Sequence, residues 1–374
     1  MNDNGPGPPL AGLRVVELAR ILAGPWAGQV LADLGAEVVK VESPEGDDTR
    51  RWGPPFVDNP DGTRDAAYFH AANRGKRSLV ADFAIEEGRA RVLDLVRDAD
   101  VLIENFKLGG LARFGLDYES LHAINPRLVY CSITGFGHDG PYAARAGYDF
   151  IVQGMSGIMD LTGDPQGPPQ KIGVAYADIL TGLYAVIAIQ AALRQREATG
   201  RGQHIDMALL DVMTGTLANQ AMNYLVSGVS PTRLGNAHPN IAPYEAYPVA
   251  DGWVIVAVGN DTQFQRFAAL LGLPDHDRWR SNAGRVEDRA ALSPAIAERT
   301  RGWSRDSLLA ALEIEGIPAG PINTVADALA DPQIAARGMV LDLGEGLKGL
   351  RTPIRFSDAE LAPAKRSPRL GEGE

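Results

Sequence analysis

Residues 171–211 read KIGVAYADILTGLYAVIAIQAALRQREATGRGQHIDMALLD, and this stretch decides how the chain is organised. Its pattern predicts a short approach strand, an aspartate, a long helix over residues 179–196, a glycine turn at Gly200 and a second strand. The helix has no proline and is apolar on almost every side, so we expect it to be buried on most faces.

Asp178 stands at the start of this predicted helix. Aspartate is a favoured N-cap, because its carboxylate accepts hydrogen bonds from the unpaired N–H groups of the first turn. The alternative is a carboxylate nucleophile presented at a buried helix start. The stretch by itself leaves both interpretations open, and capping is the commoner use of such an aspartate.

Length and composition narrow the class of protein. A chain of 374 residues predicts two domains, or one large domain with an appended piece. A net charge of −11 argues against nucleic acid as the main partner. The single cysteine, Cys131, lies in an apolar run and is expected to be a buried strand residue, the alternative being a nucleophile. One cysteine allows no internal disulfide, which fits a cytoplasmic protein.

Targeting and metal motifs are not found in the sequence. The first residues lack a basic and then apolar signal pattern, and no uninterrupted apolar run reaches membrane length. Paired-cysteine and H-E-x-x-H motifs are also lacking. We therefore expect no metal and no membrane partner.

The N-terminal half predicts a doubly wound α/β domain. Strands over residues 13–18 and 36–41 flank a helix that runs from Pro25 to about Leu34, which makes a βαβ unit. The turn from Ile21 to Gly24 then lies at the carboxyl end of the first strand, where open parallel sheets bind ligands. No G-x-G-x-x-G follows, so a nicotinamide cofactor is not indicated.

Later segments extend the same pattern. Strands are predicted over residues 79–82, 101–104, 126–134 and 203–209, and helices over residues 86–97 and from the last strand to about Leu225. Residues 42–65 are too long for an ordinary connection and predict a functional loop. The basic cluster at residues 73–78 is either solvated surface or a site for an anion.

The C-terminal half predicts a second, smaller domain of α+β type. An irregular segment over residues 230–243 marks the boundary, a strand follows over residues 253–258, and residues 262–315 are mainly helical. We assign residues 1–200 and 326–374 to the large domain, 201–229 to a linker helix region and 230–325 to the small domain. Residues 319–325 are a strand or a return linker.

Several stretches together resemble one family, the class III CoA-transferases, which include formyl-CoA and carnitine CoA-transferases and the α-methylacyl-CoA racemases. The resemblance covers essentially the whole chain. It is carried by residues 13–42, by NRGKRSL (73–79), by DVLIENFKLGGLARFGLDY (100–118), by ITGFGHDGPYAARAGYD (133–149), by YADILTG (176–182) and by residues 196–211.

The resemblance implies a fold and a mechanism. It implies an interlocked homodimer in which each chain has a Rossmann-like large domain and a small domain. The aspartate corresponding to Asp178 is the family's nucleophile: the acyl-CoA acylates it, and the released thiolate attacks the resulting anhydride to give an aspartyl-CoA thioester. The incoming acid then reverses these exchanges. CoA enters as part of the substrate, and no tightly bound cofactor is implied.

The racemase branch differs at one position. It resembles the rest but carries a histidine just before the aspartate that matches Asp149, and this chain has Tyr148 there. A tyrosine with a pKa of about 10 is a poor base at neutral pH, and His138 is too far along the chain to replace it. This favours a transferase. Asp149 either orients the nucleophile or caps a helix after Gly147.

CoA-binding residues follow from the same resemblance. The family segment near the thioester and pantetheine matches Ile21, Leu22 and Ala23, where Leu22 replaces a glutamine of some formyl-CoA transferases. Other positions that hold CoA or close over the site match Asn105, Phe106, Arg113, Gly259 and Asn260, and phosphate contacts are assigned to Lys76 and Arg77. Ser43 replaces an arginine of some relatives, so one phosphate contact is missing.

These observations predict an acyl-CoA:carboxylate CoA-transferase. The acceptor is a small mono- or dicarboxylate, succinyl-CoA is the candidate donor, and Arg50, Arg51 and Arg74 are candidate partners of the substrate carboxylate. A 2-methylacyl-CoA racemase or epimerase and a CoA-binding protein without catalysis are the two alternatives.

Overall fold

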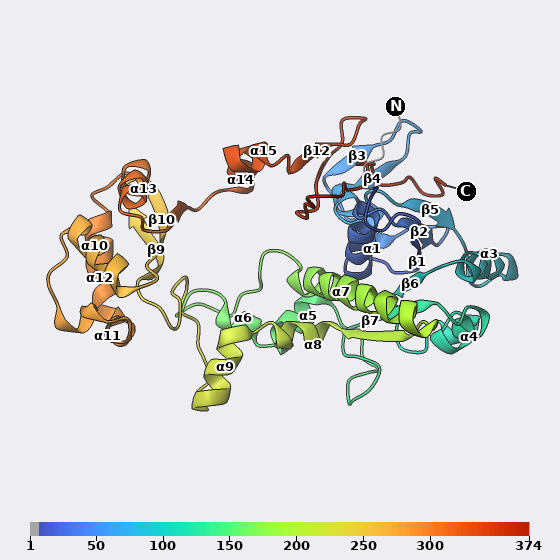
Figure 1. The fold of residues 1–374 in the computed structure, drawn as a ribbon, viewed down its shortest axis with the longest axis horizontal. Coiled ribbons are helices and arrows are strands. Elements are labelled where there is room, and N and C mark those ends of the chain that lie inside the picture. The colour runs from blue at the N-terminus through green and yellow to red at the C-terminus, as the bar shows by residue number, and fades with distance from the viewer. Residues whose placement is uncertain (1–6, 374) are drawn as a thin grey trace. The chain divides into compact units, whose positions relative to one another are not determined.

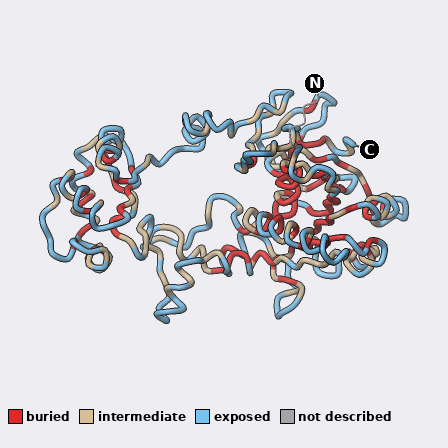
Figure 2. The backbone as a smooth tube through the Cα atoms, in the orientation of Figure 1, coloured by how far each residue is buried: buried red, intermediate tan, exposed pale blue. Residues whose placement is uncertain are grey.

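A computed structural model describes residues 7–373 of the chain. They divide into two compact units, each with its own core (Figure 1 and Figure 2). The large unit contains residues 7–158, 171–225 and 332–373, and the small unit contains residues 159–170 and 226–331.

The large unit is built on a six-stranded parallel sheet. Its strands are β1 (Arg14–Glu17), β2 (Glu37–Glu42), β5 (Arg77–Val80), β6 (Val101–Glu104), β7 (Val129–Thr134) and β8 (His204–Ala208). They lie in the order β5-β2-β1-β6-β7-β8. The order reverses between β1 and β6, and in doubly wound sheets ligands bind at this reversal, beyond the carboxyl ends of the strands.

Both faces of this sheet are covered by helices, as alternation along β1 and β6 requires. Val15 and Ile103 face a core shared with α1 (Ala23–Asp33) and α7 (Tyr176–Thr199). Val16 and Leu102 face the opposite core, under α3 (Glu86–Arg97) and α4 (Tyr118–Ile124). The predicted parallel α/β class is confirmed, and the bounds of α3 and β6 are as predicted.

Helix α7 differs from the prediction at its start. The approach strand is not formed: residues 171–175 are irregular, and the helix begins at Tyr176, so Asp178 lies inside its first turn. Helix α7 packs on α1 through Gly182, where an added Cβ would lie 2.6 Å from the Ala23 carbonyl oxygen. Only a glycine permits this approach.

The expectation that α7 is buried on most faces is wrong for the single chain. Buried side chains line one side of the helix, at Ala177, Thr181, Ala185 and Ile189. The opposite side is a second apolar face that is open to solvent, and on it Ile187 is 63% exposed. Helix α7 is also long and apolar enough to cross a membrane. Buried core helices commonly share this length and composition.

Between β2 and β5 the chain makes the predicted long loop, which is more ordered than the sequence indicated. It contains the short helix η1 (Asp48–Arg51), the hairpin of β3 (Phe56–Asp58) and β4 (Arg64–Ala66), and the one-turn helix α2 (Ala67–His70). Further along lie η2 (Ala112–Phe114), α5 (Asp149–Met155) and α6 (Ile158–Leu161).

After β8 the chain forms two helices instead of the single one predicted. These are α8 (Leu209–Gly215) and α9 (Ala218–Ser227), separated where Ala218 takes a positive φ of 46°. Because β8 is an edge strand of the sheet, residues 201–225 belong to the large unit and not to a separate linker.

The small unit has the α+β composition that was predicted. Its antiparallel sheet has the order β11-β10-β9, with β9 (Tyr244–Val249) not anticipated, β10 (Gly252–Ala257) and β11 (Ala319–Pro321). Packed on it around Phe267, Leu292 and Leu308 are α10 (Asp261–Leu271), η3 (Asp277–Arg280), α11 (Asn282–Glu287), α12 (Arg289–Thr300) and α13 (Arg305–Ile314). Helix α14 (Val325–Ala330) also belongs to this unit.

The chain then returns to the large unit. It forms α15 (Pro332–Ala336) and a hairpin of β12 (Val340–Asp342) and β13 (Lys348–Leu350). The last residues lie beside β5, the edge strand, whose Ser78 N–H donates to the carbonyl of Glu372 at 3.1 Å. The C-terminal residues therefore cover an edge that would otherwise be open.

Candidate active site

Asp178 is held in the first turn of α7 but does not cap it. The N-cap position is Ala175, and no side chain there bonds to the helix. Burial and a neighbouring carboxylate are the two influences on the Asp178 carboxyl, and within residues 7–373 it has no ion-pair partner. The capping interpretation of Asp178 is therefore wrong, and its carboxylate is left for another role.

Asp149 provides the missing cap from a distant part of the sequence. Its Oδ1 accepts a hydrogen bond from the Ala177 N–H at 2.8 Å, and its Oδ2 accepts one from the Gln153 amide at 2.8 Å. Gln153 in turn accepts from the Ile172 N–H at 2.9 Å. Asp149 thus caps α7 and not α5, the helix that it begins, and so fixes the backbone that carries Asp178.

The surroundings make the ionised form of Asp178 costly. Burial, and then the negative charge of Asp149, raise the pKa of Asp178 from 3.8 to about 7. No cation of the described chain offsets these two effects. A carboxylate with such a raised pKa is a more basic and more reactive nucleophile than an ion-paired one, and strongly shifted groups are concentrated at functional sites.

The turn between β1 and α1 faces the same edge of the sheet. Ile21 takes a positive φ of 71°, and Leu22 is the N-cap residue of α1. Ala23 follows, and its carbonyl meets Gly182 one helical turn beyond Asp178. The predicted residues Ile21, Leu22 and Ala23 therefore lie next to the first turns of α7.

Asn105 acts on this turn from the carboxyl end of β6. Its Oδ1 accepts from the Arg20 N–H at 2.8 Å, and its amide donates to the Arg20 carbonyl at 2.7 Å. The Arg20 guanidinium lies over the ring of Phe106. Asn105 thus fixes the backbone of the turn, a role that the sequence did not indicate. Its assignment to CoA stays a prediction, as does that of Phe106.

Tyr68 is a site residue that sequence reasoning missed. It lies in α2, half-buried, with its ring 5.3 Å from that of Trp52. Burial, and then the charges of Asp178, Asp149 and Asp47, raise the pKa of its hydroxyl. The phenol therefore stays protonated and can donate a hydrogen bond close to Asp178. Only the aromatic residues in and after the long loop could have drawn attention to it.

Half of the predicted cationic partners, three of six, are used inside the protein. The Lys76 ammonium is enclosed and bonds to Glu17 at 2.8 Å, to Pro25 and to Asn73, so no phosphate reaches it. Arg50 pairs with Glu42 and Asp65, and Arg74 pairs with Asp33. The basic cluster at residues 73–78 is thus largely structural. The predicted phosphate contact of Lys76 and the predicted carboxylate contacts of Arg50 and Arg74 are replaced by ion pairs within the protein.

The remaining candidates are more accessible. Arg51 pairs with Asp48, Arg77 donates to the Gly373 carbonyl, and the Arg113 guanidinium lies over the Phe114 ring. Phe106 and Ala112 line a cavity of about 250 Å³ that also borders the sheet at Glu104, Ser132 and His204. Arg77 and Arg113 remain predictions as phosphate contacts.

Two further predictions concern Tyr148 and the small unit. Tyr148 precedes α5 and is 63% exposed. Asn260 caps α10 through the Gln263 N–H, and the Gly259 N–H donates to the Gln263 side chain at 2.8 Å. These bonds explain the local structure of Gly259 and Asn260, and their role in closing over CoA stays a prediction.

The fold and this geometry define a class of protein: a doubly wound α/β protein with a buried carboxylate, unpaired within residues 7–373, beside the edge of the sheet where such folds bind ligands. The sequence model of CoA-transferase family III matches residues 10–374. The chain belongs to this family and is a CoA-transferase, so the resemblance stated from the sequence is confirmed.

Individual relatives agree. The chain is 59% identical to the succinate–glutarate CoA-transferase of Agrobacterium fabrum, covering 98% of this chain and 94% of that one. It is 40% identical to the succinyl-CoA:glutarate CoA-transferase of Mus musculus, covering 97% and 84%. Among solved structures, a CaiB/BaiF family protein of Brucella suis matches with a TM-score of 0.90 at 67% identity, covering 98% and 97%. A protein of Mycobacterium tuberculosis matches with a TM-score of 0.86 at 30% identity, covering 98% of each chain.

Asp178→Asn is expected to stabilise the protein above neutral pH. The folded state binds a proton at Asp178 more tightly than the unfolded chain does, so the wild-type carboxylate costs stability as the pH rises from about 4 to about 7. The neutral amide avoids this cost, which we expect to be ~1–3 kcal/mol at pH 8 after allowance for partial exposure.

Urea unfolding at pH 8 and at pH 5 measures this difference, which should shrink at the lower pH. Asp211→Asn, at an exposed position in the first turn of α8, is the matched control and should change stability by less than about 0.5 kcal/mol at both pH values. A variant at position 178 that is less stable than wild type at pH 8 would contradict the unpaired carboxylate.

Proposed function

We propose that this protein transfers CoA from succinyl-CoA to a small dicarboxylic acid, with glutarate as the first candidate. The observation that carries the mechanism is the unpaired carboxylate of Asp178, with a pKa raised to about 7, beside the ligand-binding edge of the sheet. The choice of acids is supported by the names of the relatives in Agrobacterium fabrum and Mus musculus.

The reaction proceeds in steps whose bonds balance. The Asp178 carboxylate attacks the thioester carbonyl of succinyl-CoA, which forms a mixed anhydride and releases the CoA thiolate. The thiolate attacks the aspartyl carbonyl, which gives an aspartyl-CoA thioester and free succinate. The incoming carboxylate then attacks the aspartyl-CoA thioester, which forms a second mixed anhydride and releases the CoA thiolate. The thiolate attacks the acyl carbonyl of this anhydride, which gives the new acyl-CoA and restores the Asp178 carboxylate.

The residues around Asp178 serve these steps. Asp149 fixes the start of α7 and, by its charge, keeps the Asp178 carboxylate basic. The Tyr68 hydroxyl, whose raised pKa keeps it protonated even above its ordinary range, donates to the carboxylate of the bound acid or to the developing oxyanion. The large domain thus acts as a Rossmann-like CoA-binding domain, with the turn at residues 21–23 holding the thioester.

The racemase alternative finds less support in the structure. It requires a second acid–base group close to Asp178. His138 lies elsewhere, with its ring 4.9 Å from that of His204 and its N–H bonded to Asp206. The exposed Tyr148 holds the place of the family histidine.

We also propose that the protein works as a homodimer. Within the large unit, exposed apolar side chains gather on three helices: Phe150, Ile151 and Met155 on α5, Leu183, Tyr184 and Ile187 on α7, and Met222, Tyr224 and Leu225 on α9. Apolar surface of this extent marks an interaction site in a folded protein. A second copy of the chain, interlocked as in the family resemblance, is the occupant we propose.

An exchange assay tests the function. Succinyl-CoA is offered with glutarate, oxalate, acetate or mesaconate, and mass spectrometry follows new CoA thioesters. We expect glutaryl-CoA from the wild type and a loss of at least about 10³-fold with Asp178→Asn, since the nucleophile is removed. No exchange with any acid, together with deuterium uptake at the α-carbon of a 2-methylacyl-CoA in heavy water, would sink the transferase proposal.

The pH dependence tests the role of Asp149. Since only the ionised Asp178 attacks, kcat/KM should fall about tenfold per pH unit below an apparent pKa of about 7. Asp149→Asn removes one of the two causes of the raised pKa and should move this limb to lower pH. An unchanged limb in the variant would show that another group sets the profile.

Sedimentation velocity tests the dimer. The chain has a mass of 39.9 kDa, and we expect a species of twice that mass. Ile187→Asp, which places a charge on the exposed face of α7, should dissociate it. Ile85→Asp changes an equally apolar residue that is 53% exposed ahead of α3, and should leave the mass unchanged. A monomer that associates with lipid vesicles through α7 would overturn the proposal.

A further inference from the structure

The turn beside the nucleophile contains a strained residue. Ile21 has a φ of 71°, and it is the one β-branched residue among the non-glycine residues with positive φ in the described part of the chain. A β-branched side chain in this region is strained and persists only where the surroundings enforce it. Contacts from elsewhere in the fold must therefore hold Ile21 in this conformation.

Asp47 supplies the contact to Ile21 itself. The Ile21 N–H points at the Asp47 carboxylate, 3.2 Å from Oδ2 and 3.4 Å from Oδ1. Asn105 holds the preceding residue, Arg20, through both its N–H and its carbonyl. The peptide before Ile21 is thus fixed from two sides, by groups from β6 and from the long loop.

Asp47 is itself held firmly and is almost completely buried. Lys40 pairs with its Oδ2 at 2.9 Å, and the Thr49 N–H and hydroxyl donate to its Oδ1 at 3.0 and 2.8 Å. Burial opposes ionisation, but Lys40 and the Thr49 hydrogen bonds outweigh it, so the pKa of Asp47 lies below its ordinary value. Asp47 therefore presents a fixed negative charge to the Ile21 amide.

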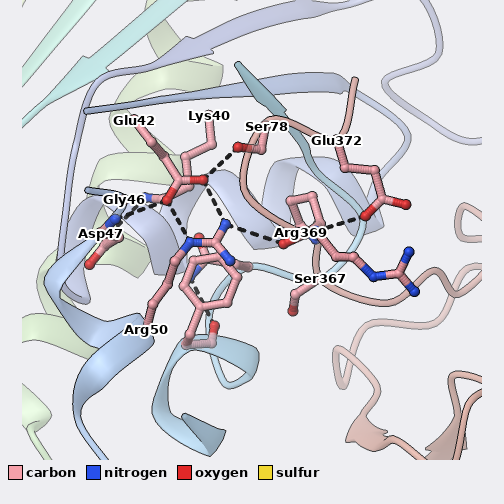
Figure 3. Close-up of polar contacts among 12 residues, drawn as sticks. Lys40, Glu42, Gly46, Asp47, Arg50, Ser78, Ser367, Arg369 and Glu372 are labelled. Atoms are coloured by element: carbon pink, nitrogen blue, oxygen red, sulfur yellow. Dashed lines mark hydrogen bonds and ion pairs between the residues drawn. The ribbon is translucent and has the colours of Figure 1, made fainter. Parts of the chain in front are cut away.

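A second carboxylate extends this arrangement to the end of the chain (Figure 3). Glu42 accepts from the Asp47 N–H at 2.9 Å, from Arg50 and from the Ser78 hydroxyl. Arg50 also donates to the Pro368 carbonyl, and the Ser78 hydroxyl accepts from the Gly371 N–H. The backbone of Asp47 is thus tied to the sheet and to the C-terminal segment.

The strained residue is close to the chemistry. Leu22 and Ala23 follow it directly, and the Ala23 carbonyl contacts α7 at Gly182, one turn beyond Asp178. The charges of both Asp178 and Asp47 contribute to the raised pKa of the Tyr68 hydroxyl. A rotation of the Ile21 peptide would therefore move backbone next to the nucleophile.

We propose that Asp47 is a positioning residue of the transfer reaction: it holds the Ile21 turn in its left-handed conformation, so that the turn sets the thioester against Asp178. The proposal rests on the proposed CoA-transfer function. Asp47 is almost completely buried, and in this proposal it acts through the backbone of Ile21 and not on the substrate.

A double-mutant cycle between Asp47→Asn and Ile21→Gly tests this role. Glycine adopts a positive φ without strain, so a turn with glycine at position 21 no longer depends on Asp47. In the wild-type background we expect Asp47→Asn to lower kcat/KM for succinyl-CoA by ~30-fold, mainly through kcat, since displaced reactants lose rate more than affinity. In the Ile21→Gly background the same change should cost less than ~3-fold.

Asp65→Asn is the matched control. Asp65 is a second buried carboxylate on Arg50, at 2.9 Å, in the same network but without contact to Ile21. Its effect on kcat should be the same in both backgrounds, whatever it does to stability. Should Asp47→Asn fail to fold, Thr49→Val removes one hydrogen bond to Asp47 at nearly equal volume, and its smaller loss should likewise vanish in the Ile21→Gly background.

Equal losses from Asp47→Asn in both backgrounds, or wild-type kcat/KM in the folded variant, would overturn the positioning role. Titration calorimetry with CoA keeps this outcome apart from a failure of the proposed function. If the wild type transfers CoA to no acid, that function fails. The positioning role is then judged by CoA affinity, which Asp47→Asn should weaken with Ile21 present but not in the Ile21→Gly background.

Discussion

The close contact between α1 and α7 is the constraint on which the rest of the site depends. Because Gly182 has no side chain, the first turns of α7 can rest on the carbonyl of Ala23 at the start of α1. Helix α1 begins at the carboxyl end of β1, next to the point where the strand order reverses. The contact therefore brings a carboxylate from residue 178 to a ligand-binding edge built from the first hundred residues.

Charge is distributed unevenly around this contact, and the unevenness has a chemical purpose. Lys40, Lys76 and Arg50 are each enclosed by carboxylates, and these pairs fix the loop and the sheet. Among the described residues, Asp149 is the one charged neighbour that shifts the pKa of Asp178, and its charge raises that pKa further. An arginine beside Asp178 would have stabilised the fold and made this carboxylate a weaker nucleophile in the proposed mechanism, since ion pairing lowers both pKa and basicity. The ion-paired carboxylates therefore stabilise the fold, whereas the unpaired Asp178 keeps the basicity that the proposed reaction needs.

Local patterns were enough to predict much of the fold, as α3 and β6 illustrate, because periodicity and flanking turns are properties of the sequence itself. Two failures at the site share one cause, a partner remote in sequence. Capping of α7 was one of the two interpretations of Asp178, but Asp149 caps the helix by bonding to a residue 28 positions further along the chain. Lys76, in a basic cluster, was predicted to bind phosphate, but in the structure its ammonium is buried and paired with Glu17. The exposed face of α7 could not be predicted from the sequence, because apolar residues are found both in protein cores and at protein interfaces.

The order in which the chain supplies these groups carries a consequence for folding. The small unit consists mainly of residues 226–331, and the segment that contacts Arg50 and Ser78 comes after it, at Pro368 and Gly371. Arg50 and Ser78 both bond to Glu42, which holds the backbone of Asp47. The support behind the Ile21 turn is therefore complete only when the last residues have docked on β5. All six strands of the parallel sheet lie before residue 209, whereas the network that orders the ligand-binding edge also needs Pro368 and Gly371. The Ile21 turn therefore depends on segments near both ends of the chain.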